Sequence, residues 1–206
     1  MIIAVPIKIV ADDQDLVVNP DLTIDGSKAP RVVSSYDLNA IEAAVQLAEG
    51  VQDARVVAVS VADAKADDSK LKKNILARGV DEFVLMADDA CADLDAHATA
   101  QLLAGMIADL QADLVICGDG SADNYAQQVD VQLADTMGLP VVTAACSVAL
   151  EEGQGTVVCD RSLETVVQTV RAALPAVVSV VPDAALPRIP GMKDILAAGK
   201  KPTSLV

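Results

Sequence analysis

Apolar, β-branched runs alternate with helical stretches along the first two thirds of this chain, and this alternation restricts the fold more than any other feature. The runs expected to form strands cover residues 2–10, 55–61, 83–86 and 114–117. The stretches that follow them predict helices at residues 38–48, 69–78, 95–110 and about 125–137. Repeated strand–helix units build mostly parallel sheets with right-handed crossovers. We therefore predict an α/β fold of Rossmann-like type, with helices flanking the sheet.

The pattern changes beyond residue 140, where short strand-like runs follow one another without helices. These runs cover residues 141–143, 147–150, 156–159 and 165–170, and Gly153 with Gly155 predicts a hairpin turn between two of them. A last buried strand is expected at residues 177–181, a short helix at 192–198, and a small hairpin near 16–24. The sequence thus predicts an antiparallel hairpin excursion from the parallel sheet. We divide the chain into an α/β domain, residues 1–185, and a C-terminal segment, residues 186–206.

The net charge and the positions of the cysteines argue against several kinds of partner and of site. The formal net charge is −15, and a surface of this sign repels nucleic acids and anionic membranes. No run reaches the ~18 apolar residues of a membrane span, and the first residues lack a signal-peptide pattern, so we expect a cytoplasmic protein. The four cysteines form no CxxC pair and His97 is the only histidine, which argues against a zinc site or a disulfide framework. Cys117 is expected in the core.

The segment with the clearest chemistry covers residues 118–129, directly after the fourth predicted strand. In open α/β sheets, ligands bind beyond the carboxyl ends of the strands. Gly118 and Gly120 would let the backbone approach a ligand closely because they lack a Cβ atom. The third glycine of the dinucleotide fingerprint and the lysine of a P-loop are both missing. The segment therefore indicates a different kind of nucleotide site, and the alternative is an ordinary glycine-rich turn with capping side chains.

A helix that begins near Tyr125 would direct its free N–H groups and positive dipole end at a phosphate. Gln127 has two alternative roles at this position. It could form a capping box with Asn124, or it could donate to phosphate oxygens together with Gln128.

No set of side chains suggests acid–base or nucleophilic catalysis. Ser121 has no histidine nearby in the sequence, and His97 lies alone on a predicted helix. We therefore expect a protein that binds a cofactor which brings its own chemistry, and not an enzyme.

Four segments resemble the beta subunits of electron transfer flavoproteins, most closely those of the Fix-type branch. They are residues 36–44, residues 117–129, residues 174–178, and the stretch that covers 189–193 and 197–202. These segments span nearly the whole chain in the order expected for that family. The resemblance implies an adenine nucleotide alpha-hydrolase-like fold.

The resemblance also implies cofactors and partners. Beta subunits of this family pair with an alpha subunit, which carries most of the FAD. They hold a second nucleotide, usually AMP, and in electron-bifurcating members a second FAD that accepts hydride from NADH. The family carries electrons between dehydrogenases, such as the acyl-CoA dehydrogenase type, and a downstream acceptor.

Nucleotide contacts carried over from the family fall on four parts of the chain, with the phosphate expected on Ala126 to Val129. Pro6 is a departure, because a proline has no N–H to donate. The expected contact residues are Pro6, Ser34, Ser35, Tyr36, Asp37, Val61, Gly118, Asp119, Gly120, Ser121, Asp123, Tyr125, Ala126, Gln127, Gln128 and Val129.

The family recognises its dehydrogenases through a loop before the C-terminal helix. Here that loop would lie around residues 186–193, with Ile189 as an apolar anchor and Pro190 and Met192 beside it. The alternative is a proline-rich linker without a partner.

Two other functions are compatible with this architecture. A stand-alone adenine-nucleotide-binding regulatory module would need no flavin, although such modules usually have a longer glycine-spaced phosphate loop. An NAD-dependent oxidoreductase is disfavoured, because the glycine fingerprint and a suitable acid–base residue are missing.

Overall fold

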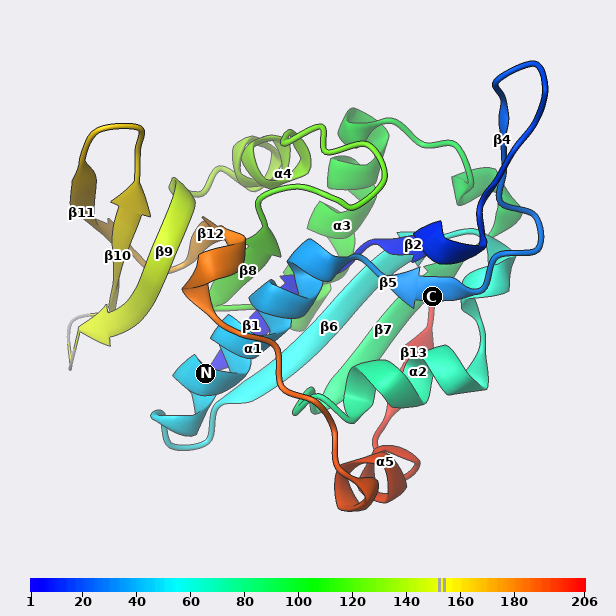
Figure 1. The fold of residues 1–206 in the computed structure, drawn as a ribbon. Helices are drawn as coiled ribbons and strands as arrows, with labels where there is room; N and C mark the ends of the chain where they lie inside the picture. The colour runs from blue at the N-terminus through cyan, green and yellow to red at the C-terminus, as the bar shows by residue number, and fades with distance from the viewer. Residues whose placement is uncertain (152, 154) are drawn as a thin grey trace.

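The computed structural model describes residues 1–151, 153 and 155–206 (Figure 1). One sheet contains the strands β1 (Ile2–Pro6), β6 (Arg55–Ala62), β7 (Glu82–Ala87), β8 (Leu114–Gly118), β9 (Val141–Glu151), β10 (Thr156–Ser162), β11 (Val167–Ala173), β12 (Ala176–Val180) and β13 (Thr203–Leu205). Their order is β11-β10-β9-β12-β8-β1-β6-β7-β13. In this order, each pair of neighbours from β9 through β12, β8, β1, β6 and β7 to β13 is parallel. The pairs β9–β10 and β10–β11 are antiparallel. The predicted α/β fold with an antiparallel excursion is confirmed.

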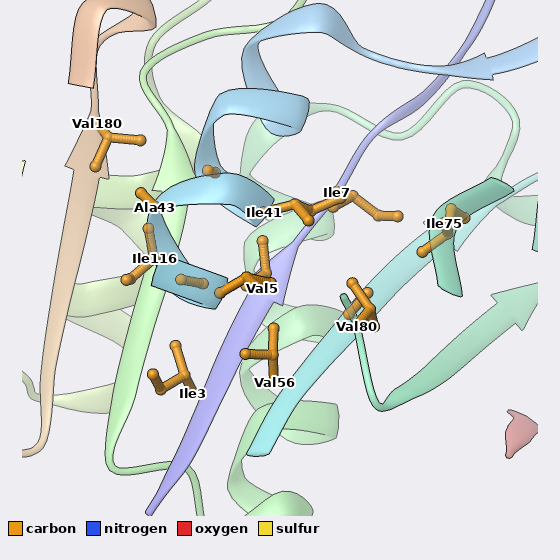
Figure 2. Packing of buried hydrophobic residues seen from close by; sticks show 14 of the residues in the cluster. Ile3, Val5, Ile7, Ile41, Ala43, Val56, Ile75, Val80, Ile116 and Val180 are labelled. Atoms are coloured by element: carbon orange, nitrogen blue, oxygen red, sulfur yellow. The ribbon is translucent and has the colours of Figure 1, made fainter. Parts of the chain in front are cut away.

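Helices cover both faces of this sheet. They are α1 (Ser35–Glu49), α2 (Ser69–Leu76), α3 (Ala96–Leu110), α4 (Val129–Met137) and α5 (Met192–Ala198). Alternation along β1 explains the two cores, because successive side chains of a strand point to opposite faces. Ile3 and Val5 pack with Ile41 of α1 (Figure 2), and Ala4 packs on the other side with Leu103 of α3. None of these helices is long and apolar enough to cross a bilayer.

The strand order places a topological switch point between β1 and β8. The chain continues from β1 to β6 and β7 on one side, whereas β8 and β12 lie on the other side. The loops that leave the carboxyl ends of β1 and β8 therefore diverge, and such a divergence opens a crevice for ligands.

The expected first strand, residues 2–10, is wrong as a single element. β1 ends at Pro6, and β2 (Ile9–Ala11) belongs to a separate two-stranded sheet with β5 (Arg31–Val33). The break follows from a long-range contact, because the N–H of Lys8 donates to Oδ2 of Asp37 at 2.7 Å. The predicted hairpin near residues 16–24 is present as β3 (Val17–Val18) and β4 (Ile24–Asp25).

The antiparallel part also differs in detail from the sequence expectation. Residues 141–143 and 147–150 belong to one long strand, β9, in which Ala144 takes a positive φ of 57°. Gly153 and Gly155 have φ values of 70° and 57°, as the predicted hairpin turn requires. Residues 152 and 154 of that turn lie outside the described residues.

The C-terminal segment contains the predicted helix α5 and a strand that the sequence did not predict. β13 pairs in parallel with β7 at the edge of the sheet. Lys201 anchors this return, because its Nζ donates to the carbonyl oxygens of Leu76 at 3.1 Å and Val80 at 2.6 Å. Residues 203–205 therefore extend the sheet by one edge strand.

Candidate functional site

A cleft of about 950 Å³ opens at the switch point, beyond the carboxyl ends of β1, β6 and β8. Most of the residues expected to contact a nucleotide line it, although they come from four separate parts of the chain. These lining residues are Pro6, Ser35, Asp37, Val61, Gly118, Asp119, Gly120, Ser121, Asp123, Ala126, Gln127, Gln128 and Val129.

Ser34, Tyr36 and Tyr125 are not among the lining residues; they hold the loop in place. The Oγ atom of buried Ser34 accepts a hydrogen bond from the backbone N–H of Ala122 at 3.2 Å. The Tyr36 and Tyr125 rings lie 5.0 Å apart with an interplanar angle of 39°, within the range of favourable aromatic pairs. The loop therefore rests on the beginning of α1.

The helix after this loop begins later than the sequence predicts. α4 starts at Val129, because Tyr125 and Gln127 have positive φ values of 44° and 54° that no α-helix can contain. The predicted capping box between Asn124 and Gln127 is absent: the Asn124 N–H donates to Asp123, and Nε2 of Gln127 donates to the Tyr125 hydroxyl. A local polar network, which composition alone does not reveal, replaces the first helical turn.

Both glycines of the loop are needed, but their close neighbours are groups of the protein itself. A Cβ atom on Gly118 would lie 2.7 Å from Oδ1 of Asp37 and 3.0 Å from the Tyr36 backbone. A Cβ atom on Gly120 would lie 2.2 Å from the Tyr125 ring. The sequence-based interpretation was that glycine lets a ligand approach the backbone. The structure offers a second reason at both positions, which is that glycine makes room for Asp37, Tyr36 and Tyr125.

Replacing Gly120 by alanine is expected to displace the Tyr125 ring and to separate the two tyrosines, at a cost of about 1 kcal/mol in unfolding free energy. The chain has two tyrosines and no tryptophan, so tyrosine fluorescence and near-ultraviolet circular dichroism report this contact directly. Urea unfolding measures the cost.

The matched control introduces Gly120→Ala into a Tyr125→Ala background, where the ring is gone and the second substitution is expected to be nearly neutral. An equal cost in both backgrounds would contradict the proposed clash.

Asp37 connects three elements at the bottom of the cleft. Its buried carboxylate accepts from the Lys8 N–H after β1 and from the backbone of Gly118 at the end of β8, while Asp37 itself lies in the first turn of α1. Burial raises the pKa of this carboxyl to about 7, against the opposing effect of these backbone hydrogen bonds.

Lys8 and Asp123 tie the loop to the end of β1. The Lys8 Nζ atom lies 2.6 Å from Oδ2 of Asp123, and the Ser121 hydroxyl donates to the same carboxylate at 2.6 Å. Although burial works in the opposite direction, the hydrogen bonds from Lys8 and Ser121 hold the pKa of Asp123 below its usual range. This role of Lys8 was not predicted from the sequence, because its partner lies 115 residues away.

Several acidic side chains line the cleft beside its apolar residues. Burial raises the pKa of Asp119, whose Oδ2 atom accepts from the Tyr125 hydroxyl at 3.1 Å. Asp130, in the first turn of α4, is buried and also lines the cleft. Arg31, a second cation of the lining, is paired with Asp63.

The arrangement is suited to binding and contains no acid–base pair around a nucleophile among the described residues. The Ser121 hydroxyl donates to a carboxylate, and His97 lies on α3 beside Gln101, outside the lining. A volume of about 950 Å³ lies within the range of small-molecule and cofactor sites. A nucleotide therefore fits the cleft by size, with free N–H groups at the beginning of α4.

The segment expected to recognise a partner lies apart from the cleft. Ile189 is 94% exposed and Met192 is 73% exposed, with Pro190 partly exposed between them. Arg188 anchors this segment to α1, because its Nε donates to Oε2 of buried Glu42 at 2.7 Å. The exposed apolar side chains are thus presented from a fixed base.

The chain is similar to a known protein family. A family model described as electron transfer flavoprotein domain matches residues 21–206, which include the loop after β8, helix α4 and the C-terminal segment.

Proposed function

The chain belongs to the electron transfer flavoprotein family, and from this premise we propose that it is a beta subunit of the Fix-type branch. The observation that carries the proposal is the cleft at the switch point, which gathers residues of the β1, β6 and β8 ends around the loop of residues 118–129. The subunit would carry electrons without breaking bonds itself, as one half of a heterodimer in the cytoplasm.

The proposed cofactors are FAD, shared with an alpha subunit, and AMP or a second FAD in the cleft. The flavin would supply the redox chemistry. The backbone of residues 126–129 would hold a phosphate, since Gln128 precedes α4 and leaves the first N–H groups of that helix available. Asp37 and Lys8 would fix the two walls between which the nucleotide lies.

The proposed partners are the alpha subunit and a dehydrogenase of the acyl-CoA type. Residues 186–206 would form the partner-contact segment, with Ile189, Pro190 and Met192 presented to the dehydrogenase. The exposure of Ile189 and its anchoring through Arg188 to Glu42 support this role, because a recognition loop needs accessible apolar anchors on a rigid base.

The test is a count of bound cofactors. The chain is co-expressed with its alpha partner, the complex is purified and denatured, and the released FAD and AMP are quantified by chromatography. We expect one FAD and one AMP per heterodimer for a single-flavin carrier, or two FAD and no AMP for a bifurcating one.

A complex without flavin would contradict the proposal. AMP retained by the chain alone, with no flavin in any preparation, would favour a stand-alone adenine-nucleotide-binding regulator.

A further inference from the structure

Asp130 is a buried acid that faces the cleft without a protein partner. Its residue is 6% exposed, and it belongs to the lining of the cleft. Among residues 1–151, 153 and 155–206, no hydrogen bond or ion pair to its carboxylate is formed. The fully enclosed unpaired side-chain atoms of the described residues are Ser60 Oγ, Asp119 Oδ1 and Ser179 Oγ, so the Asp130 oxygens remain accessible from the cleft and can accept hydrogen bonds from a bound molecule.

The surroundings of Asp130 do not compensate its charge. Its charge raises the pKa values of both Cys117 and Asp119, in addition to the larger effect of burial on each. The two cations of the cleft, Lys8 and Arg31, are engaged by other acids. The positive end of the α4 dipole favours a negative charge in the first turn, but it does not donate hydrogen bonds to the carboxylate oxygens.

We propose that Asp130 accepts hydrogen bonds from the ribose hydroxyl groups of the bound nucleotide. This inference rests on the proposed function and adds an orientation of the nucleotide within the cleft. A phosphate beside Asp130 would be repelled, whereas a vicinal diol offers two neutral donors to the two carboxylate oxygens. The same pairing of an acidic residue with a ribose occurs in dinucleotide sites of other α/β folds.

The orientation places the ribose over the first turn of α4. The phosphate is then directed away from the Asp130 carboxylate, toward the backbone N–H groups of residues 126–129 at the very beginning of the helix. Asp130 thus becomes a specificity-determining residue for ribonucleotides, although in the sequence it resembles an ordinary acid that stabilises a helix beginning.

Binding of nucleotide analogues to the unmodified protein tests the proposal without any mutation. The complex with the alpha partner is first stripped of its bound adenine nucleotide. It is then titrated calorimetrically with AMP, 2′-deoxy-AMP, 3′-deoxy-AMP and IMP. We expect about tenfold weaker binding of at least one deoxy analogue, and unchanged binding of IMP, which lacks the adenine amino group.

Equal affinity for AMP and both deoxy analogues would overturn this assignment alone. A loss with IMP but not with the deoxy analogues would assign Asp130 to the adenine amino group and overturn the ribose contact. Failure of AMP, its deoxy analogues and FAD alike to bind would overturn the proposed function as well.

The variant Asp130→Asn, with Asp135→Asn on the exposed side of the same helix as control, separates recognition from charge. We expect Asp130→Asn to weaken AMP binding and to bring the AMP to 2′-deoxy-AMP affinity ratio close to one, while Asp135→Asn leaves the ratio unchanged. Tighter AMP binding by Asp130→Asn would show that the carboxylate merely repels a phosphate, and would overturn the proposal.

Discussion

Replacing Gly118 by valine is expected to lower the free energy of unfolding by roughly 3 kcal/mol, the upper part of the range for overpacked sites. A Cβ atom at this position would lie 2.7 Å from the Asp37 carboxylate and 3.0 Å from the Tyr36 backbone. Neither group can move freely, because the carboxylate accepts from Lys8 and the Tyr36 backbone belongs to the first turn of α1. Urea unfolding followed by far-ultraviolet circular dichroism measures the loss.

The matched control is Gly105→Ala in the middle of α3, where a Cβ atom would meet nothing within 4 Å. This substitution is expected to stabilise the protein by about 0.5–1 kcal/mol, because glycine is the poorer helix former. A Gly118→Val chain as stable as the original would show that the end of β8 tolerates a side chain, and it would remove the assigned contact between Gly118 and Asp37.

Replacing Asp37 by asparagine is expected to change how stability depends on pH. The folded pKa of about 7 lies above the ordinary value of 3.8, so between these values the folded chain binds more protons than the unfolded chain. The contribution of Asp37 to the unfolding free energy is therefore largest below about pH 4, falls as the pH rises toward 7, and then stays constant.

The size of the Asp37 effect follows from the shift. A difference of about three pKa units corresponds to at most roughly 4 kcal/mol. The unfolding free energy of the original chain minus that of Asp37→Asn should therefore decrease by up to this amount from pH 4 to pH 8. Urea unfolding at a series of pH values measures it, and Asp135→Asn on the protein surface controls for the change in net charge. A difference that does not vary with pH would contradict a raised pKa for Asp37.

Local patterns in the sequence were sufficient for most of the fold. The cap of α2 shows why: the Asp68 carboxylate accepts from the N–H groups of Lys70 and Leu71, a contact within four residues. Alternation in β1 and the periodicity of α3 are equally local. Elements that depend on distant contacts were missed, and β13 is an example. Residues 203–205 form a strand because they pair with β7, and Lys201 just before them donates to the carbonyl oxygens of Leu76 and Val80.

The candidate site was predicted in its location but not in its construction. Residues 118–129 were identified because glycines and polar residues follow a buried strand, and the structure places them at the expected edge of the sheet. The beginning of α4 was predicted four residues too early, because the left-handed backbone of Tyr125 depends on its contacts with Tyr36 and Asp119. Lys8 and Asp130 were not expected in the site at all.

The sequence by itself determined the class of the fold and the family, and it singled out residues 118–129 as the candidate site, since strand–helix alternation and short motifs are properties of neighbouring residues. Only the tertiary structure decided which charges meet. Asp37 joins the ends of β1 and β8, Lys8 reaches Asp123, and Asp130 is left in the cleft without a protein donor. Burial and charge pairing depend on distances between residues far apart in the chain, and these distances exist only after the sheet has assembled.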